Sequence, residues 1–128
     1  MTADNQGTPR ITIVGTCASG KSTLRRALRM HGYNASVTAQ EHSAVPALWA
    51  RTNPDVVIVL QADLDAVRLR RNNPRWSAKV WSAQQERLAD AIGHANLVTD
   101  TSSISVDQVV NQVLEFLADF VQDSAHDR

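Results

Sequence analysis

The chain has 128 residues, of which 43% are hydrophobic and 20% charged, and its 13 basic residues balance its 13 acidic ones. These values are typical of one globular domain, and the zero net charge removes any general attraction to nucleic acid or to an anionic membrane. The longest apolar run, 56–60, is far too short to span a bilayer. The first ten residues carry no apolar signal segment, and the single cysteine, Cys17, has no partner for an intramolecular disulfide. We therefore expect a cytoplasmic protein with no nucleic-acid or membrane partner.

Strand-like and helix-like segments alternate along the chain. The segment 56–60 lacks polar alternation, which is typical of a parallel strand buried on both faces. The segment 33–41 is poorly apolar and suits an edge strand. Ser105 opens the last helix through a capping box with Gln108. The expected strands are 11–14, 33–41, 56–60 and 97–99, and the expected helices are 21–31, 46–51, 64–71, 78–94 and one that follows 105.

This alternation predicts an α/β fold with three layers, αβα, built on a minimal parallel sheet of about four strands. The strands 11–14 and 56–60 must both be interior, so the predicted spatial order of the strands is 2-1-3-4. Trp49 and Trp81 are expected in the core. We expect the domain to span residues 10–122, between mobile tails at 1–9 and 123–128.

The segment 15–22 reads G-T-C-A-S-G-K-S and matches G-x-x-x-x-G-K-[ST], the pattern of a phosphate-binding loop between a strand and a helix. We call it the glycine-rich loop. Its N–H groups from Thr16 to Lys21 can surround a phosphate at the positive end of the following helix. Lys21 would bridge the β- and γ-phosphates, and the Ser22 hydroxyl would bind Mg²⁺. The chain has two lysines against eleven arginines, so a lysine at this position does not follow from a lysine-rich composition. The predicted phosphate-binding residues are Gly15, Thr16, Cys17, Ala18, Ser19, Gly20, Lys21, Ser22 and Thr23.

With this loop, the chain resembles the P-loop NTPase superfamily, and within it the small kinases of the adenylate, shikimate and nucleoside kinase type. It is also similar to short uncharacterised bacterial P-loop proteins. Three segments, 11–24, 54–71 and 95–117, carry the resemblance. The resemblance implies ATP with Mg²⁺ and transfer of the γ-phosphoryl group to a small acceptor. It also implies that Arg68 or Arg71 stacks on the base, that Arg75 approaches the transferred phosphate, and that 99–102 lies beside the base.

The chain departs from these kinases because it has no hydrophobic strand that ends in Asp, so their usual carboxylate for Mg²⁺-bound water is missing. Glu41 is the predicted substitute, since the end of its strand would lie near the phosphates. The alternative is a solvated glutamate on an edge strand. His42 would line the pocket or lie at the surface, and Asp63 or Asp65 would act at a strand end or cap the next helix. Lys21, Glu41 and Arg75 are thus the predicted catalytic residues, and Ser22 and Glu41 the predicted metal ligands.

Three functions remain open at this point. The first is a kinase-like phosphotransferase or NTPase that acts on an unknown small-molecule acceptor. The second is a nucleotide-dependent binding or scaffold module with a protein partner and little turnover. The third is a GTPase-like switch, because 60–63 partly matches a guanine-reading pattern, although no D-x-x-G precedes it. ATP is expected in preference to GTP.

Overall fold

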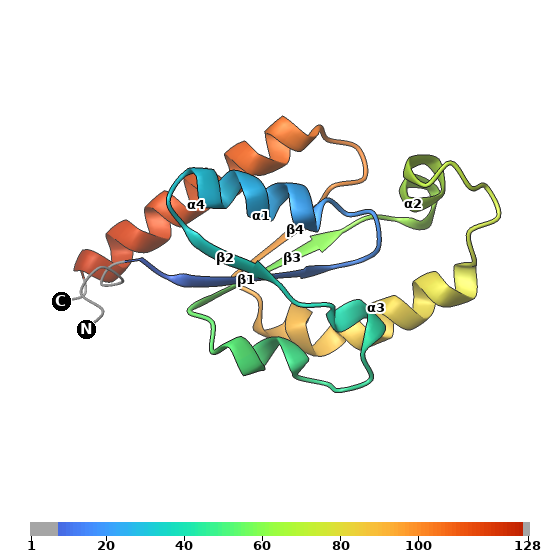
Figure 1. Ribbon diagram of the computed structural model, residues 1–128, viewed down its shortest axis with the longest axis horizontal. Helices are drawn as coiled ribbons and strands as arrows, with labels where there is room; N and C mark the ends of the chain where they lie inside the picture. The colour runs from blue at the N-terminus through green and yellow to red at the C-terminus, as the bar shows by residue number, and fades with distance from the viewer. Residues whose placement is uncertain (1–7, 127–128) are drawn as a thin grey trace.

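The computed structural model describes residues 8–126, and these form one parallel sheet covered by helices on both faces (Figure 1). The predicted α/β class is confirmed. The predicted strand order is confirmed as well, since the strands lie in the order β2-β1-β3-β4. The strands are β1 (Arg10–Gly15), β2 (Asn34–Val37), β3 (Val56–Gln61) and β4 (Leu97–Asp100).

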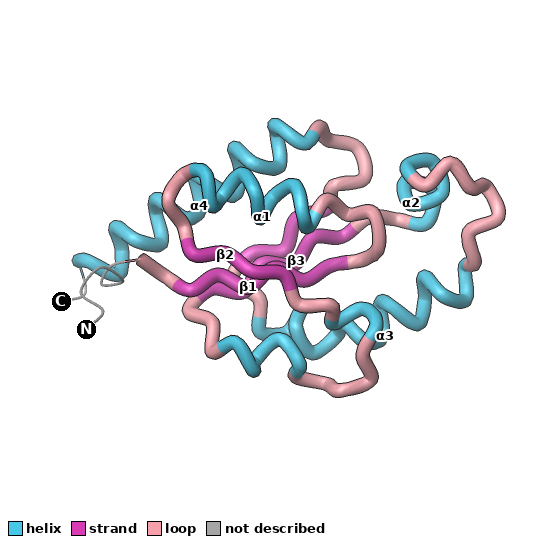
Figure 2. The backbone as a smooth tube through the Cα atoms, viewed as in Figure 1, coloured by secondary structure: helices cyan, strands magenta, loops and turns pink. Residues whose placement is uncertain are grey.

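The helices divide between the two faces of the sheet, as the tube view shows (Figure 2). α1 (Lys21–Met30) and α4 (Val106–His126) cover one face. α3 (Ala78–His94) covers the other, together with the short 3₁₀ helices η2 (Gln40–His42) and η3 (Leu48–Thr52). α2 (Leu64–Arg70) follows β3 and lies beyond the carboxyl ends of the strands. The arrangement is consistent with three αβα layers.

The core follows from the apolar pattern of the sequence. β3 is buried along 56–60 and pairs with β1 on one side and β4 on the other, as an interior parallel strand must. On α1, Leu24 and Leu28 are buried one turn apart. On α4, Val109, Val113 and Leu117 repeat this spacing, whereas Val106 in the first turn is 52% exposed. Ser105 and Gln108 form the predicted capping box, with N···O distances of 2.8 and 3.1 Å.

The segment 33–41 differs from the predicted long edge strand, because β2 ends at Val37 and Glu41 lies in η2. The buried side chain of Gln40 explains the difference. Its Nε2 donates to the carbonyl of Val45 at 2.7 Å, and its Oε1 accepts from the N–H of Trp49 at 3.0 Å. A buried amide must satisfy these groups, so the chain folds around Gln40 instead of continuing along the sheet edge.

The ends of the chain are described only in part. Residues 1–7 of the tail expected at 1–9, and 127–128 of the one expected at 123–128, lie outside the described residues. α4 continues to His126, beyond the expected domain end at 122. Over the part of the chain that is described, no helix combines the length and the apolar character needed to cross a membrane.

Candidate functional site

The glycine-rich loop connects β1 to α1 and is anchored to the end of β3. The N–H of Thr16 donates to the carbonyl of Leu60 at 3.2 Å, and the Thr16 hydroxyl accepts from the N–H of Ala62 at 2.9 Å. A Cβ on Gly15 would lie 2.3 Å from the same Leu60 carbonyl oxygen, so only glycine allows this close approach. The first half of the loop is therefore fixed to the sheet.

The second half of the loop leaves backbone N–H groups without a protein acceptor at the start of α1. Ala18 and Gly20 have positive φ angles of 58° and 102°, which turn the chain sharply before the helix. The first N–H groups of a helix have no partner within it. Within residues 8–126, the N–H groups of Ala18, Gly20, Lys21 and Ser22 donate to no protein acceptor. These groups form the available anion cradle, at the positive end of the α1 dipole.

The cradle is shorter than the predicted one, which began at Thr16. The Thr16 N–H is committed to Leu60, and the N–H of Cys17 donates to Oε1 of Gln84 on α3 at 3.0 Å. The N–H of Ser19 turns back to the carbonyl of Thr16 at 3.2 Å, and its buried hydroxyl has no hydrogen-bond partner. Ser22 and Thr23 are exposed in the first turn of α1, where their hydroxyls are accessible.

Lys21 folds back over the loop. Its Nζ donates to the carbonyls of Gly15 and Thr16, both at 2.9 Å, and lies 2.8 Å from Oε2 of Glu41. The side chains of Lys21 and Glu41 are only 12% and 5% exposed. The structure thus brings together two predicted catalytic residues that lie twenty positions apart in the sequence.

Glu41 reaches the loop from η2. Its backbone carbonyl accepts from Nη1 of Arg87 at 3.2 Å, which ties η2 to α3. Its Oε2 contacts Lys21 and lies 3.7 Å from Nε2 of His42, whereas its Oε1 is buried without a hydrogen-bond partner. The alternative of a solvated edge-strand glutamate is wrong, because Glu41 is buried.

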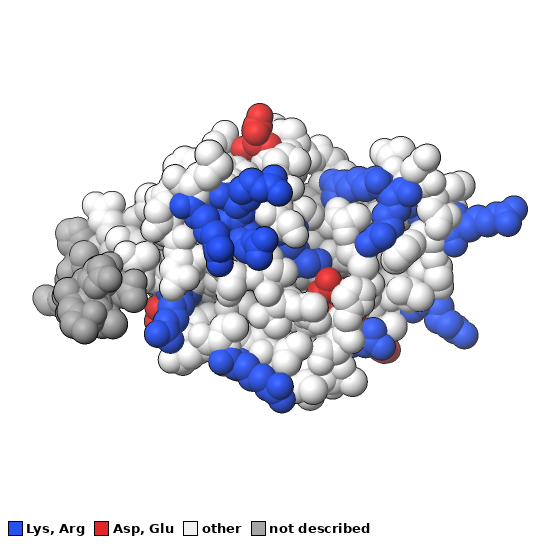
Figure 3. Space-filling view, in the orientation of Figure 1, with Lys and Arg blue, Asp and Glu red and all other residues white. Residues whose placement is uncertain are grey.

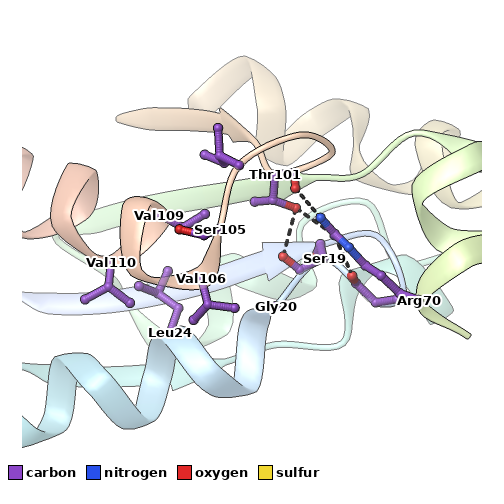
Figure 4. A pocket seen from close by; sticks show the side chains of 11 residues that line it. Ser19, Gly20, Leu24, Arg70, Thr101, Ser105, Val106, Val109 and Val110 are labelled. Atoms are coloured by element: carbon purple, nitrogen blue, oxygen red, sulfur yellow. Dashed lines mark hydrogen bonds between the residues drawn. The ribbon is translucent and has the colours of Figure 1, made fainter.

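A cavity of ≈ 280 Å³ opens beside the loop, between α1 and the start of α4. Leu24 forms part of its floor, and Val106, Val109 and Val110 line the wall opposite Arg70 (Figure 4). No Asp or Glu is among the residues that line it. The cavity is thus mainly apolar, and it adjoins the cradle through Ala18, Ser19 and Gly20.

Arg70 closes one end of this cavity. Its guanidinium donates to the carbonyl of Ala18 at 2.9 Å, to the hydroxyl of Thr101 at 3.1 Å and to the Thr101 carbonyl (Figure 4). The Thr101 hydroxyl in turn donates to the carbonyl of Ser19 at 3.0 Å. One arginine and one threonine therefore join the loop to the segment that follows β4.

The other arginines near α2 lie apart from the cradle. Nε of Arg68 donates to the carbonyl of Trp76 at 3.0 Å, and the guanidinium of Arg71 lies 4.5 Å from the centre of the Trp76 ring. Both are thus engaged with the chain that leads into α3. Arg75 is exposed. The structure does not bring these three predicted residues to the loop.

Two of the aspartates near the loop, Asp63 and Asp100, form local hydrogen bonds. Asp63 caps α2 by accepting from the N–H of Ala66 at 2.8 Å, which confirms the capping alternative, and Asp65 is exposed in the first turn. Asp100 accepts from the hydroxyl of Ser102 at 2.5 Å and from its N–H at 2.9 Å. These bonds, with a smaller effect from the nearby Arg70 charge, lower the pKa of Asp100 below its ordinary value.

Positive side chains gather around the site although the whole chain is neutral. Figure 3 shows Lys and Arg atoms over α1 and at the end that carries α2 and the start of α3, with few acidic atoms on this face. Arg25, Arg26 and Arg29 are the exposed arginines of α1. This distribution favours an anionic ligand.

Sequence reasoning did not select Arg70 and missed Gln84. Arg70 and Arg71 lie three and four residues after Val67, which is fully buried, and both spacings share a helix face. That spacing separates these two arginines from Arg68 but does not distinguish one from the other. Gln84 lies 67 residues from Cys17 and no local pattern marks it.

The two tryptophans expected in the core, Trp49 and Trp81, are only half-buried. Nε1 of Trp49 donates to the carboxylate of Asp90, and Nε1 of Trp81 donates to the carbonyl of Ala62.

No protein-family model matches the chain, and no curated protein is significantly similar to it in sequence.

Proposed function

We propose that the protein binds a nucleoside triphosphate, ATP with Mg²⁺, at the glycine-rich loop and acts as a kinase-like phosphotransferase or NTPase on a small acceptor. One observation carries the proposal. Four unpaired N–H groups and the ammonium of Lys21 meet at a helix N-terminus, beside an apolar cavity; the four groups are those of Ala18, Gly20, Lys21 and Ser22. Phosphates would occupy the N–H groups and the base would occupy the cavity.

The size and lining of the cavity support a single ring system. Pockets that hold a whole drug-sized ligand measure about 300–1,000 Å³. The ≈ 280 Å³ here suits a base, with the ribose and phosphates outside along the loop. Thr101 and the backbone of 99–102 would supply polar contacts to the edge of the base.

The same lining favours adenine over guanine. Guanine presents an extra amino donor that a carboxylate would recognise. None of the residues that line the cavity is acidic, and the Asp63 carboxylate of the guanine-reading pattern is occupied as the cap of α2. Adenine, with fewer donors, fits an apolar wall.

The catalytic groups would work mainly by charge neutralisation and positioning. On binding, Lys21 would exchange Glu41 for β- and γ-phosphate oxygens, and the Ser22 hydroxyl would hold Mg²⁺. The released Glu41 carboxylate would then be free to orient a Mg²⁺-bound water or accept the proton of the acceptor.

A nucleotide-dependent binding module is the second candidate, and the Lys21–Glu41 pair is the observation that favours it. Release of Glu41 would loosen η2 and could expose a surface to a protein partner with little turnover. Such a module would require the same loop and the same lysine.

Calorimetric titration of ATP and GTP with Mg²⁺ tests the proposal. The wild type should bind ATP more tightly than GTP, and Lys21→Ala should abolish binding while its circular dichroism spectrum stays unchanged. Lys79→Ala is the matched control, because Lys79 is the other lysine and lies exposed on α3. Retained affinity in Lys21→Ala would refute the phosphate-binding loop. ADP release, with and without candidate acceptors, then separates the enzyme from the binding module.

A further inference from the structure

Three potential metal ligands meet where the glycine-rich loop contacts η2. They are Cys17, Glu41 and His42, and one ligand atom from each lies within 4.8 Å of the other two. Nε2 of His42 lies 3.9 Å from Sγ of Cys17 and 3.7 Å from Oε2 of Glu41. We propose that these three side chains bind a zinc-class divalent metal ion.

The distances are close to those of a tetrahedral site. With zinc–ligand bonds of about 2.0–2.3 Å, neighbouring donor atoms lie about 3.4–3.6 Å apart. The two separations from His42 exceed this by a few tenths of an ångström. His42 is exposed and lies in the short helix η2, so its ring can move inward without disturbing the core. Three protein ligands leave a fourth position for water.

The carboxylate of Glu41 is only partly satisfied. Its Oε2, the oxygen that lies 3.7 Å from His42, also contacts Lys21, and its Oε1 is buried with no hydrogen-bond partner although the residue is only 4% exposed. A buried carboxylate oxygen without a partner carries an energetic penalty, and a bound cation would remove it.

Gln84 prepares the sulfur atom as a ligand. The N–H of Cys17 donates to Oε1 of Gln84 at 3.0 Å, which fixes the orientation of the amide. Nε2 of Gln84 must therefore face Sγ, which it approaches at 3.0 Å. An N–H donor directed at sulfur stabilises the thiolate that metals require, and such outer partners commonly orient metal ligands.

The ligand types select the metal. Thiolate and imidazole favour Zn²⁺, Co²⁺ and related ions, whereas Mg²⁺ prefers oxygen ligands and retains its waters. The ligands of this site thus differ in chemistry from the Ser22 hydroxyl, which is the proposed ligand of Mg²⁺. The inference does not depend on nucleotide binding, and it places the ion where it would clamp η2 to the loop.

Titration of the metal-free protein with Co²⁺, in the absence of nucleotide, tests the proposal. We expect one equivalent to bind with a sulfur-to-cobalt charge-transfer band and the strong visible bands of tetrahedral Co²⁺, and Zn²⁺ to displace it. Cys17→Ser should abolish the charge-transfer band. His42→Ala should weaken binding more than about 100-fold, which exceeds the usual loss for an outer partner.

His94→Ala is the matched control. His94 is 61% exposed against 59% for His42, and its ring also lies 3.7 Å from a carboxylate oxygen, that of Asp90, but no cysteine is beside it. Its removal should leave Co²⁺ binding unchanged. The proposal fails if wild type shows no charge-transfer band, or if His42→Ala and His94→Ala weaken binding equally. Because His42 is exposed, its variant keeps the test decisive even if Cys17→Ser does not fold.

Discussion

Nζ of Lys21 and Oε2 of Glu41 form a largely buried ion pair, 2.8 Å apart, at the mouth of the glycine-rich loop. Removing one partner of such a pair leaves an uncompensated charge, which is costly. An anion that enters the cradle must compete with Glu41 for the lysine. The pair therefore couples occupancy of the loop to the position of η2.

Glu41→Gln should separate binding from turnover. The neutral side chain no longer competes for Lys21, so MgATP should bind at least as tightly as in wild type, while ADP release should fall by about 10²–10⁴-fold if Glu41 is the general base. Calorimetry and a coupled ADP assay measure the two quantities. Glu86→Gln, on the exposed face of α3, is the control. An unchanged rate in Glu41→Gln would assign Glu41 a structural role only.

Gly15→Ala should destabilise the fold. The new Cβ would lie 2.3 Å from the Leu60 carbonyl oxygen, and relief of such a clash typically costs about 1–3 kcal/mol or more. Gly93→Ala is the matched control, because no atom beyond the neighbouring backbone of its own helix lies within 4 Å of the added Cβ and alanine raises helix propensity by about 1 kcal/mol. Urea unfolding should move in opposite directions for the two variants. Equal midpoints would contradict the close approach of the loop to β3.

Arg70→Ala should weaken MgATP binding about tenfold, which corresponds to about 1.4 kcal/mol. The variant loses the bonds to Ala18 and Thr101 that hold the loop against the segment after β4. Arg75→Ala, which removes an exposed arginine from the turn before α3, should bind normally. The reverse result would restore Arg75 as the residue that contacts phosphate.

Ser102→Ala should raise the pKa of Asp100 toward its ordinary value. Hydrogen bonds from Ser102 hold this pKa down in the folded state, so the carboxylate stabilises the fold above about pH 3.9 and loses this contribution as the pH falls through the folded-state pKa. The variant loses the side-chain bond but keeps the backbone one, so a partial upward shift is expected. NMR titration of the carboxyl carbon measures it, and Ser103→Ala, which removes an exposed neighbouring hydroxyl, should give no shift.

The sheet was predictable because its signals are local. The apolar run of β3, the pattern that precedes the glycine-rich loop and the capping box at Ser105 each depend on a few neighbouring residues. The extent of β2 was not predictable, since the buried amide of Gln40 ends it through bonds to residues five and nine positions away. Such bonds depend on tertiary packing and leave no periodic pattern.

The site was predictable in part for the same reason. Lys21 follows from its motif, and the position of Glu41 followed from strand order, although a 3₁₀ turn and not a strand end delivers it. Arg70 was not selected from the sequence, because the spacing from the buried Val67 favours Arg70 and Arg71 alike, and only the structure shows the Arg70 guanidinium bonded to the loop at Ala18. Gln84 required the packing of α3 against the loop.

The double anchorage of Thr16 has a mechanical consequence. Its N–H and hydroxyl bind the loop to Leu60 and Ala62, so the sheet side of the loop moves with β3 as one body. On the opposite side, the ion pair of Lys21 with Glu41 joins the loop to η2, and the Glu41 carbonyl joins η2 to Arg87 of α3. A displacement of Lys21 at the cradle would thus reach α3 through η2, while the sheet side of the loop stays with β3.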